Sequence, residues 1–224
     1  MKTIFFGASS SIVKWAYKDI YENSDIEYCE YDAKTSLKGL KKLLICTGKG
    51  KLLPYGIKDR LYKKTLGYKF LFEKENEVLF VFTCQNGLFY QGGFFTFVNY
   101  LKSKYKNCKC VFYYNDLIST CEPTKLDGVK SVFDLVLTFD SVEAQKYGIS
   151  YYGVVHSKAL PSNEESAEES DIFYAGSDRG RYNDIIKAFT IFADSGKRCV
   201  FYLFDVLKEN KENLNAFLKS CKQN

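Results

Sequence analysis

The sequence predicts an α/β protein: a Rossmann-like domain with a mostly parallel sheet, followed by a partial second β-α-β-α unit. Two observations lead to this prediction. Short apolar runs of strand length alternate with segments whose apolar residues are three to four positions apart. The run from Val78 to Phe82 is continuously apolar, as is typical of a central strand covered on both faces. The chain of 224 residues is 46% hydrophobic and 17% aromatic, which allows a large core and argues against intrinsic disorder.

Residues 1–105 contain the first part of this alternation. Their opening apolar run is only three residues long, too short for the apolar core of a secretory signal, so we interpret it as a first strand. Runs of strand length and runs with helical spacing then follow one another. The expected strands are 2–6, 26–31, 68–72 and 78–83, and the expected helices are 12–21, 36–46, 56–67 and 93–105.

The alternation continues to residue 160, with expected strands at 110–114, 133–138 and 149–156. Asp140 follows the second of these strands and can cap a short helix over residues 143–147, with Glu143 at the capping-box position and Gly148 as the helix end. Repeated strand and helix units of this kind favour a parallel sheet. Residues 1–160 are therefore expected to form one domain.

Residues 161–170 are polar and acidic and have no apolar periodicity, so we interpret them as a linker. A strand from residue 171, a helix at 182–193, a strand at 199–204 and a helix at 207–221 are expected after it. This second unit, residues 171–224, is too short to bury a sheet face well by itself.

The turn that opens the second unit has the composition of an anion site. Gly176, Ser177, Arg179, Gly180 and Arg181 stand between the expected strand and the expected helix. Glycines allow close approach of the backbone, a helix N-terminus offers unpaired N–H groups, and arginines bind phosphate, so the pattern suits a diphosphate. It is neither the dinucleotide fingerprint nor a P-loop. The alternative interpretation is an ordinary strand-to-helix turn with exposed arginines.

Positive charge is concentrated in one segment. Residues 38–69 hold nine lysines and Arg60 against the single acid Asp59, interleaved with leucine and tyrosine, while the whole chain has a net charge of +5. Cations mixed with apolar residues suit an anionic membrane surface. Nucleic acid is not expected as a partner, because no nucleic-acid-binding motif is present. A solvated basic face with a few buried leucines is the alternative.

The cysteines and the apolar runs bear on location. Without an export signal the cysteines are expected to be reduced and buried, and no metal site is expected, because Cys108, Cys110 and a single histidine lack zinc-ligand spacing. No apolar run approaches the ~20 residues of a membrane span. We therefore expect a cytoplasmic protein. A peripheral position on the inner face of the cell membrane is compatible with this expectation. The cysteines are Cys29, Cys46, Cys84, Cys108, Cys110, Cys121, Cys199 and Cys221.

Two stretches carry a resemblance to a known family. Residues 133–140 (FDLVLTFD) with 144–148 (AQKYG), and residues 171–177 (DIFYAGS) with Gly180 and Arg181, resemble the GT-B-fold glycosyltransferases of lipopolysaccharide and capsule synthesis and their spore-maturation relatives. The resemblance implies an acceptor-binding first domain and a second domain that binds a nucleotide sugar, with the turn at 176–181 facing the donor diphosphate and no metal or other cofactor. A donor domain of the family is longer than residues 171–224, so the chain is expected to be a shortened enzyme or one half of a split one.

Ligands of open α/β sheets bind at the carboxyl ends of strands, which selects further candidates. Asp116 is the first choice as general base, because a desolvated carboxylate there can have a raised pKa; the alternative is a turn cap. His156 is a second catalytic candidate, with a surface or core role as the alternative, and Asp140 has the alternative of a helix cap. The acceptor-side candidates are Gly7, Ser9, Ser10, Asn86 and Asp140.

The sequence thus leads to a glycosyltransferase that moves a sugar from a nucleotide-diphosphate sugar to a glycan or lipid-linked acceptor. Two alternatives stay open. One is a non-catalytic acceptor-binding or membrane-docking half that works with a donor-half protein partner. The other is a Rossmann-type nucleotide-binding module, which the missing fingerprint glycines disfavour.

Overall fold

The computed structural model describes residues 2–8, 17–31, 37–68, 77–153, 171–177 and 182–204. The chain divides into two compact units, residues 1–160 and 161–224. Both have the expected α/β class, with strands that are parallel to their neighbours.

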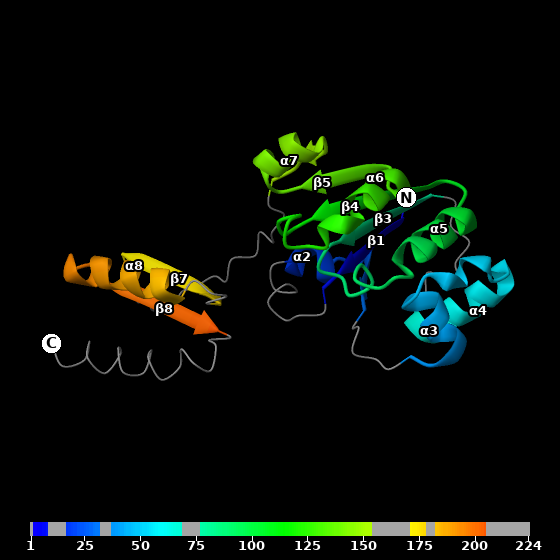
Figure 1. Ribbon diagram of the computed structural model, residues 1–224, viewed down its shortest axis with the longest axis horizontal. Helices are drawn as coiled ribbons and strands as arrows, with labels where there is room; N and C mark the ends of the chain where they lie inside the picture. The colour runs from blue at the N-terminus through cyan, green and yellow to red at the C-terminus, as the bar shows by residue number, and fades with distance from the viewer. Residues whose placement is uncertain are drawn as a thin grey trace. The chain divides into compact units, whose positions relative to one another are not determined.

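Unit 1 contains a six-stranded sheet with the order β2-β1-β3-β4-β5-β6 (Figure 1). All five neighbouring pairs are parallel. The strands are β1 (Lys2–Gly7), β2 (Ile26–Glu30), β3 (Val78–Thr83), β4 (Cys108–Tyr114), β5 (Leu135–Thr138) and β6 (Ser150–Tyr151). The first strand of the chain therefore lies inside the sheet, between β2 and β3.

Helices connect these strands (Figure 1). Their described bounds are α2 (Lys18–Tyr21), α3 (Gly39–Ile45), the 3-10 helix η1 (Lys49–Leu52), α4 (Tyr55–Leu66), α5 (Phe94–Lys104), the 3-10 helix η3 (Pro123–Lys125), α6 (Leu126–Val132) and α7 (Ser141–Tyr147). None of the helices in the described ranges is both long enough and apolar enough to cross a membrane.

Aromatic side chains form the core between the sheet and α5. Phe6 of β1 and Phe82 of β3 stack with ring centroids 4.2 Å apart and an interplanar angle of 2°. Phe97 of α5 meets Phe6 edge-on at 5.7 Å, and Phe94 meets Phe82 at the same distance. Phe112 of β4 is also fully buried. Such pairs contribute ~0.5–1.5 kcal/mol each beyond their burial, so this layer fixes α5 against the three central strands.

The α3–α4 segment is attached to both ends of α5. The Gly93 N–H donates to Ile45 O over 2.8 Å, and the Gly92 N–H donates to Cys46 O over 3.0 Å. At the other end Asp59 of α4 accepts from Lys104 Nζ over 2.8 Å and from the Tyr100 hydroxyl. Burial opposes ionisation of Asp59, but these hydrogen bonds outweigh it and hold the pKa of that carboxyl below its usual value.

The structure differs from the sequence expectations at α6 and β6. No helix was predicted over residues 126–132. Gly128 lies in the middle of this helix and leaves room for the Phe95 ring, which a Cβ would approach to 2.6 Å. The strand expected at 149–156 is described only as Ser150–Tyr151. Expected elements or parts of them at 12–16, 69–72, 154–156 and 207–221, and the linker at 161–170, lie outside the described residues.

Unit 2 has one described strand-helix-strand crossover. Strand β7 (Ile172–Ser177) pairs in parallel with β8 (Cys199–Phe204), and α8 (Tyr182–Asp194) runs alongside them (Figure 1). Asp171 Oδ2 accepts from the Arg198 N–H over 2.9 Å and so joins the amino ends of the two strands. The expected helix and second strand are confirmed.

We expect Gly93→Ala to destabilise unit 1. A Cβ at Gly93 would lie 2.0 Å from Leu44 O and 2.4 Å from Ile45 O, and these backbone atoms can retreat only if α3 separates from α5. Overpacking of this kind costs about 1–3 kcal/mol or more. Urea unfolding, followed by fluorescence of the chain's single tryptophan, Trp15 in unit 1, measures the loss.

Gly56→Ala is the matched control. A Cβ at this position in α4 has nothing within 4 Å, so the change should be neutral or should stabilise by up to ~1 kcal/mol. Equal unfolding midpoints for the two variants would contradict the close packing of α3 on α5.

Candidate functional site

The strand order places the candidate site of unit 1 at one edge of the sheet. From β1 the chain moves outward to β2, and from β3 it moves in the opposite direction through β4 to β6. Ligands of open parallel sheets bind where the order reverses, outside the carboxyl ends of the strands. Here that position is the carboxyl edge, formed by the ends of β1 at Gly7, β3 at Thr83 and β4 at Tyr114.

Asn115 connects the segments that leave this edge. Its Nδ2 donates to the Tyr17 hydroxyl over 2.8 Å and to Gln85 Oε1 over 2.9 Å, and its Oδ1 accepts from Cys84 Sγ over 3.1 Å. Burial raises the pKa of the Tyr17 hydroxyl, so the phenol is neutral and its oxygen can accept. We call Tyr17, Cys84, Gln85 and Asn115 the Asn115 cluster. Its two half-buried amides are groups of the kind that orient polar ligands.

Asn86, an acceptor-side candidate, follows Gln85 in the turn after β3 and is buried. Its side chain is 1% exposed. Its Nδ2 donates to Gly7 O over 2.6 Å and to Cys29 O over 3.2 Å, while its Oδ1 accepts from the Leu88 N–H over 3.0 Å. The side chain therefore ties the carboxyl ends of β1 and β2 to the turn after β3.

Gly7, another candidate, is required for close packing of Tyr28. A Cβ at Gly7 would lie 2.0 Å from the Tyr28 hydroxyl oxygen. That hydroxyl donates to Ala8 O over 3.0 Å, and burial raises its pKa. The glycine thus allows the backbone after β1 to turn beside the tyrosine ring.

Asp116, the candidate general base, directly follows Asn115 and is half-buried. Its Oδ1 accepts from the N–H of the next residue, Leu117, over 2.9 Å. A turn-capping aspartate accepts from the backbone two residues on, so this contact is not the expected cap. The structure therefore places the carboxylate at the carboxyl edge, next to the Asn115 cluster. The contact with Leu117 uses one of its oxygens.

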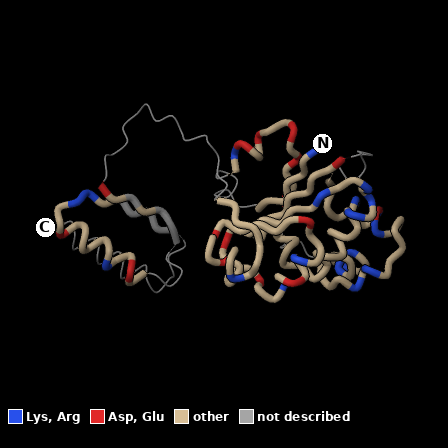
Figure 2. The backbone as a smooth tube through the Cα atoms, turned by 90° about the horizontal axis from the view of Figure 1, so that it is seen from above, with Lys and Arg blue, Asp and Glu red and all other residues tan. Residues whose placement is uncertain are grey.

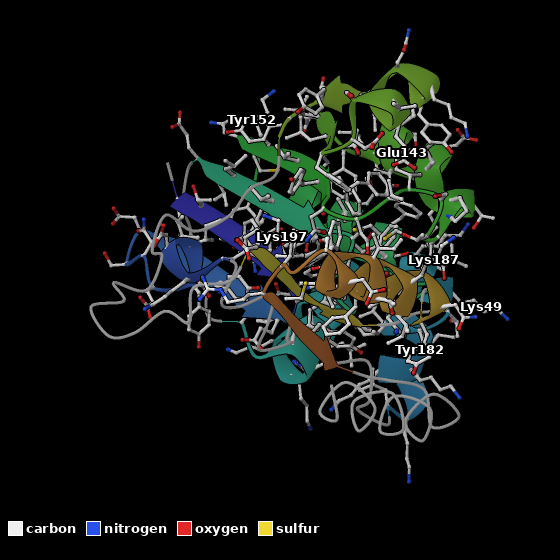
Figure 3. The ribbon with its side chains drawn as sticks, turned by 90° about the vertical axis from the view of Figure 1, so that its left-hand side faces the viewer. Lys49, Glu143, Tyr152, Tyr182, Lys187 and Lys197 are labelled. Carbon is white, nitrogen blue, oxygen red and sulfur yellow. The ribbon has the colours of Figure 1, made fainter. Side chains whose placement is uncertain are left out.

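Asp140 caps α7, as the sequence suggests. Its Oδ1 accepts from the Glu143 N–H over 2.7 Å. Glu143 does not complete a capping box; it points inward (Figure 3) and is 8% exposed. Its carboxylate accepts from the Ile118 N–H over 2.8 Å and from the Ser119 N–H over 3.3 Å. Glu143 thereby anchors the loop after β4, because the buried amides of that loop need acceptors.

Of the remaining candidates, two lie in a described strand and six lie outside the described residues. Gly176 and Ser177 are the last two residues of β7, at its carboxyl end. Helix α8 begins at Tyr182, four residues after the start of the intervening turn (Figure 3). Outside the described residues lie Ser9, Ser10, His156, Arg179, Gly180 and Arg181.

Sequence reasoning missed Gln85, Asn115 and the role of Glu143. The available signal was position: a run of polar residues follows β3 and another follows β4, and only one residue of each run was selected. Tyr17 has no such signal, because its contact depends on how the segment after β1 returns to the sheet.

Two further observations concern pockets and metal ligands in the described ranges. A shallow pocket of about 210 Å³ lies at the amino ends of β5 and β6, lined partly by Lys130, Asp134 and Ser150, and so is not part of the carboxyl edge. Within the part of the chain that the structure describes, no group of three or more His, Cys, Asp or Glu residues could hold a metal ion.

Comparisons with known proteins identify no relative. No family model, no curated protein and no solved structure matches the chain.

We expect Asn86→Ala to destabilise unit 1 strongly. The change removes three hydrogen bonds and leaves two carbonyls and one N–H buried, each costing about 1–3 kcal/mol when unsatisfied, less whatever water enters the space. The same urea titration with Trp15 fluorescence measures it. Asn107→Ala, at an exposed position, should stay within ~0.5 kcal/mol of the wild type. A small effect at Asn86 would show that the contacts with β1 and β2 are dispensable.

Proposed function

We propose that this protein is a nucleotide-sugar-dependent glycosyltransferase, acting alone or with a donor-half partner, that moves a sugar to a glycan or lipid-linked acceptor. One observation carries the proposal. In unit 2, β7 ends at Ser177 and α8 begins at Tyr182, so the carboxyl end of a parallel strand is joined to the N-terminus of a 13-residue helix by four residues. Two of these four are arginines.

This arrangement has the parts that a leaving diphosphate needs. A helix N-terminus supplies unpaired N–H groups and a partial positive charge. Arg179 and Arg181 can add charge-assisted hydrogen bonds, and Gly176 and Gly180 allow the backbone to approach the phosphates. Stabilising the negative charge that develops on the leaving group is the main catalytic requirement in such a transfer, and a metal is not needed for it.

Unit 1 would bind the acceptor. The carboxyl edge offers the amides of the Asn115 cluster, which match the hydroxyl groups of a sugar. Asp116 stands beside them as the general base that would take a proton from the attacking hydroxyl. One carboxylate oxygen accepts from Leu117 N, and the other is the one proposed to face the acceptor.

Titration with uridine or guanosine diphosphate tests the donor site. We expect amide shifts at residues 176–183, at an affinity of about 1 mM, or about −4 kcal/mol. In Arg181→Ala these shifts should be lost, since one charge-assisted contact is typically worth ~1.5–3 kcal/mol.

Lys197→Ala is the matched control for that experiment. Lys197 is an exposed cation of the same unit, located before β8 and so at the other end of the strands from the turn (Figure 3). This variant should bind as the wild type does. Absence of shifts at residues 176–183 at high nucleotide concentration, or equal losses in both variants, would remove the donor-site proposal.

A specific observation favours a second candidate function, membrane docking. Leu52 is 86% exposed, and Tyr55 and Ile57 nearby are 48% and 43% exposed. Exposed cations surround them in sequence, and Figure 2 shows lysines and arginines gathered where α3 and α4 lie. The Lys49 side chain extends away from the ribbon (Figure 3). The exposed cations of this segment are Lys38, Lys42, Lys49, Lys51, Arg60, Lys63 and Lys64.

Anionic lipid fits this surface because both kinds of contact are present. Each cation near such a membrane contributes about 1 kcal/mol, and burial of a leucine side chain contributes ~1.5–3 kcal/mol. We expect the protein to co-sediment with vesicles containing phosphatidylserine and not with neutral vesicles, and to be released by salt. Leu52→Ser should weaken binding without changing its salt dependence, whereas Lys51→Ala should reduce that dependence. Equal binding to neutral and anionic vesicles would contradict the electrostatic contribution.

A further inference from the structure

Two cysteines from separate segments meet next to the carboxyl edge. Cys84 follows β3, and Cys121 lies in the loop after β4. Their sulfur atoms are 3.4 Å apart, and the residues are 0% and 3% exposed. A disulfide requires about 2.05 Å between the sulfurs, so little more than 1 Å of movement separates the thiol pair from a bond.

The two thiols have different environments. Cys121 donates to Cys84 Sγ, Cys84 donates to Asn115 Oδ1, and Thr120 Oγ1 lies 3.9 Å from Cys121 Sγ. When Cys121 loses its proton, the Cys84 thiol can turn to donate to the thiolate. This hydrogen bond is the main cause that lowers the pKa of Cys121 to about 7, and it raises that of Cys84. Cys121 is therefore the nucleophile and Cys84 the resolving thiol.

The backbone beside Cys121 is strained. Glu122 has φ of 49°, and among the described residues it is the one that is not glycine and has a positive φ. Such a conformation is unfavourable for a residue with a side chain and persists only where the surroundings impose it. Here Glu143 fixes the start of the loop at Ile118 and Ser119. Cys121 and Glu122 belong to no helix or strand, so movement of Cys121 need not disturb a regular element.

We propose that Cys84 and Cys121 form a reversible disulfide on exposure to a hydroperoxide. The Cys121 thiolate attacks one peroxide oxygen, the O–O bond breaks, and the departing oxygen leaves as hydroxide, which takes up a proton to become water. Cys121 is now a sulfenic acid. The Cys84 sulfur attacks the Cys121 sulfur, its proton goes to the departing hydroxyl, and a second water leaves. In total two thiols and one hydrogen peroxide give one disulfide and two waters.

Proximity, not acidity, decides the outcome. The lowered pKa gives Cys121 more thiolate at pH 7 than an ordinary thiol has, but a less basic thiolate is also less nucleophilic, so the net gain in rate is small. The second step gains far more, because the resolving thiol already touches the reacting sulfur. Cys108 and Cys110 also lie close in sequence, but both have raised pKa values, caused first by burial.

The bond would alter the candidate site. Cys84 is the donor to Asn115 Oδ1, and a disulfide sulfur carries no proton to donate. Oxidation would therefore free one acceptor of the Asn115 cluster and draw the loop after β4 inward. This inference does not depend on the proposed glycosyltransferase activity.

Peptide mapping of the full-length chain tests the proposal. The reduced protein is treated with hydrogen peroxide, its remaining thiols are alkylated, and disulfide-linked peptides are identified by mass spectrometry. We expect one dominant link, between the peptides of Cys84 and Cys121, that dithiothreitol reverses. Its initial rate should rise as the pH increases through about 7 and then level off, because the thiolate of Cys121 is the reactive form.

Three variants sharpen the test. In Cys84→Ser a sulfenic acid should accumulate at Cys121 and be trapped by dimedone, and in Cys121→Ser the link and the modification should both vanish. Cys46→Ser, which changes a half-buried cysteine elsewhere, should give the wild-type link. Links spread over several cysteine pairs, or oxidation of Cys121 in the wild type without a link to Cys84, would overturn the proposal. If a variant fails to fold, the peptide map of the wild type is sufficient to distinguish these outcomes.

Discussion

The aromatic layer between β1, β3, β4 and α5 is the contact on which unit 1 depends. Phe6, Phe82, Phe94 and Phe97 interlock in pairs, and α5 can reach them only because Gly93 lets the end of α3 pass within hydrogen-bond distance. Close-packed interiors transmit small displacements, so the position of α5 is coupled to the position of the three central strands. The basic α3–α4 segment packs against the same helix, α5, and is held there by hydrogen bonds.

The polar contacts at the carboxyl edge follow from this packing. With the three strands in register, their carboxyl ends bring Asn86 under Gly7 and Asn115 beside Gln85. Each of these amides joins two segments that are far apart in the sequence. The edge is therefore assembled by buried hydrogen bonds as well as by strand pairing, and it leaves Asp116 half-buried beside them.

Periodicity in the sequence was sufficient for the class of fold and for most of the described strands and helices. Strand β3 and helix α8 follow apolar patterns that local residues determine. Helix α6 was not predicted. Its Gly128 is a poor helix former, and a glycine is required there because the Phe95 ring packs against it, a contact that no local pattern reveals. The site was harder to predict for the same reason: Asn115 gains its role from Tyr17, 98 residues earlier in the chain. The capping role of Asp140 was easier to predict, since a helix cap depends on neighbouring residues alone.

The internal position of β1 also sets an order of assembly. Val78 of β3 pairs opposite Cys108, about 30 residues later, whereas Lys2 of β1 pairs opposite Val78, about 75 residues later. Closing the shorter loop costs roughly 3 kcal/mol of chain entropy and closing the longer one roughly 4 kcal/mol. The shorter segment already contains Phe82, Phe94 and Phe97. During synthesis, β1 leaves the ribosome first and can pair with β2, since Thr3 lies opposite Ile26 about 23 residues later, but its other side has to wait for β3. The pairing of β3 with β4 is therefore the less costly route to the aromatic layer.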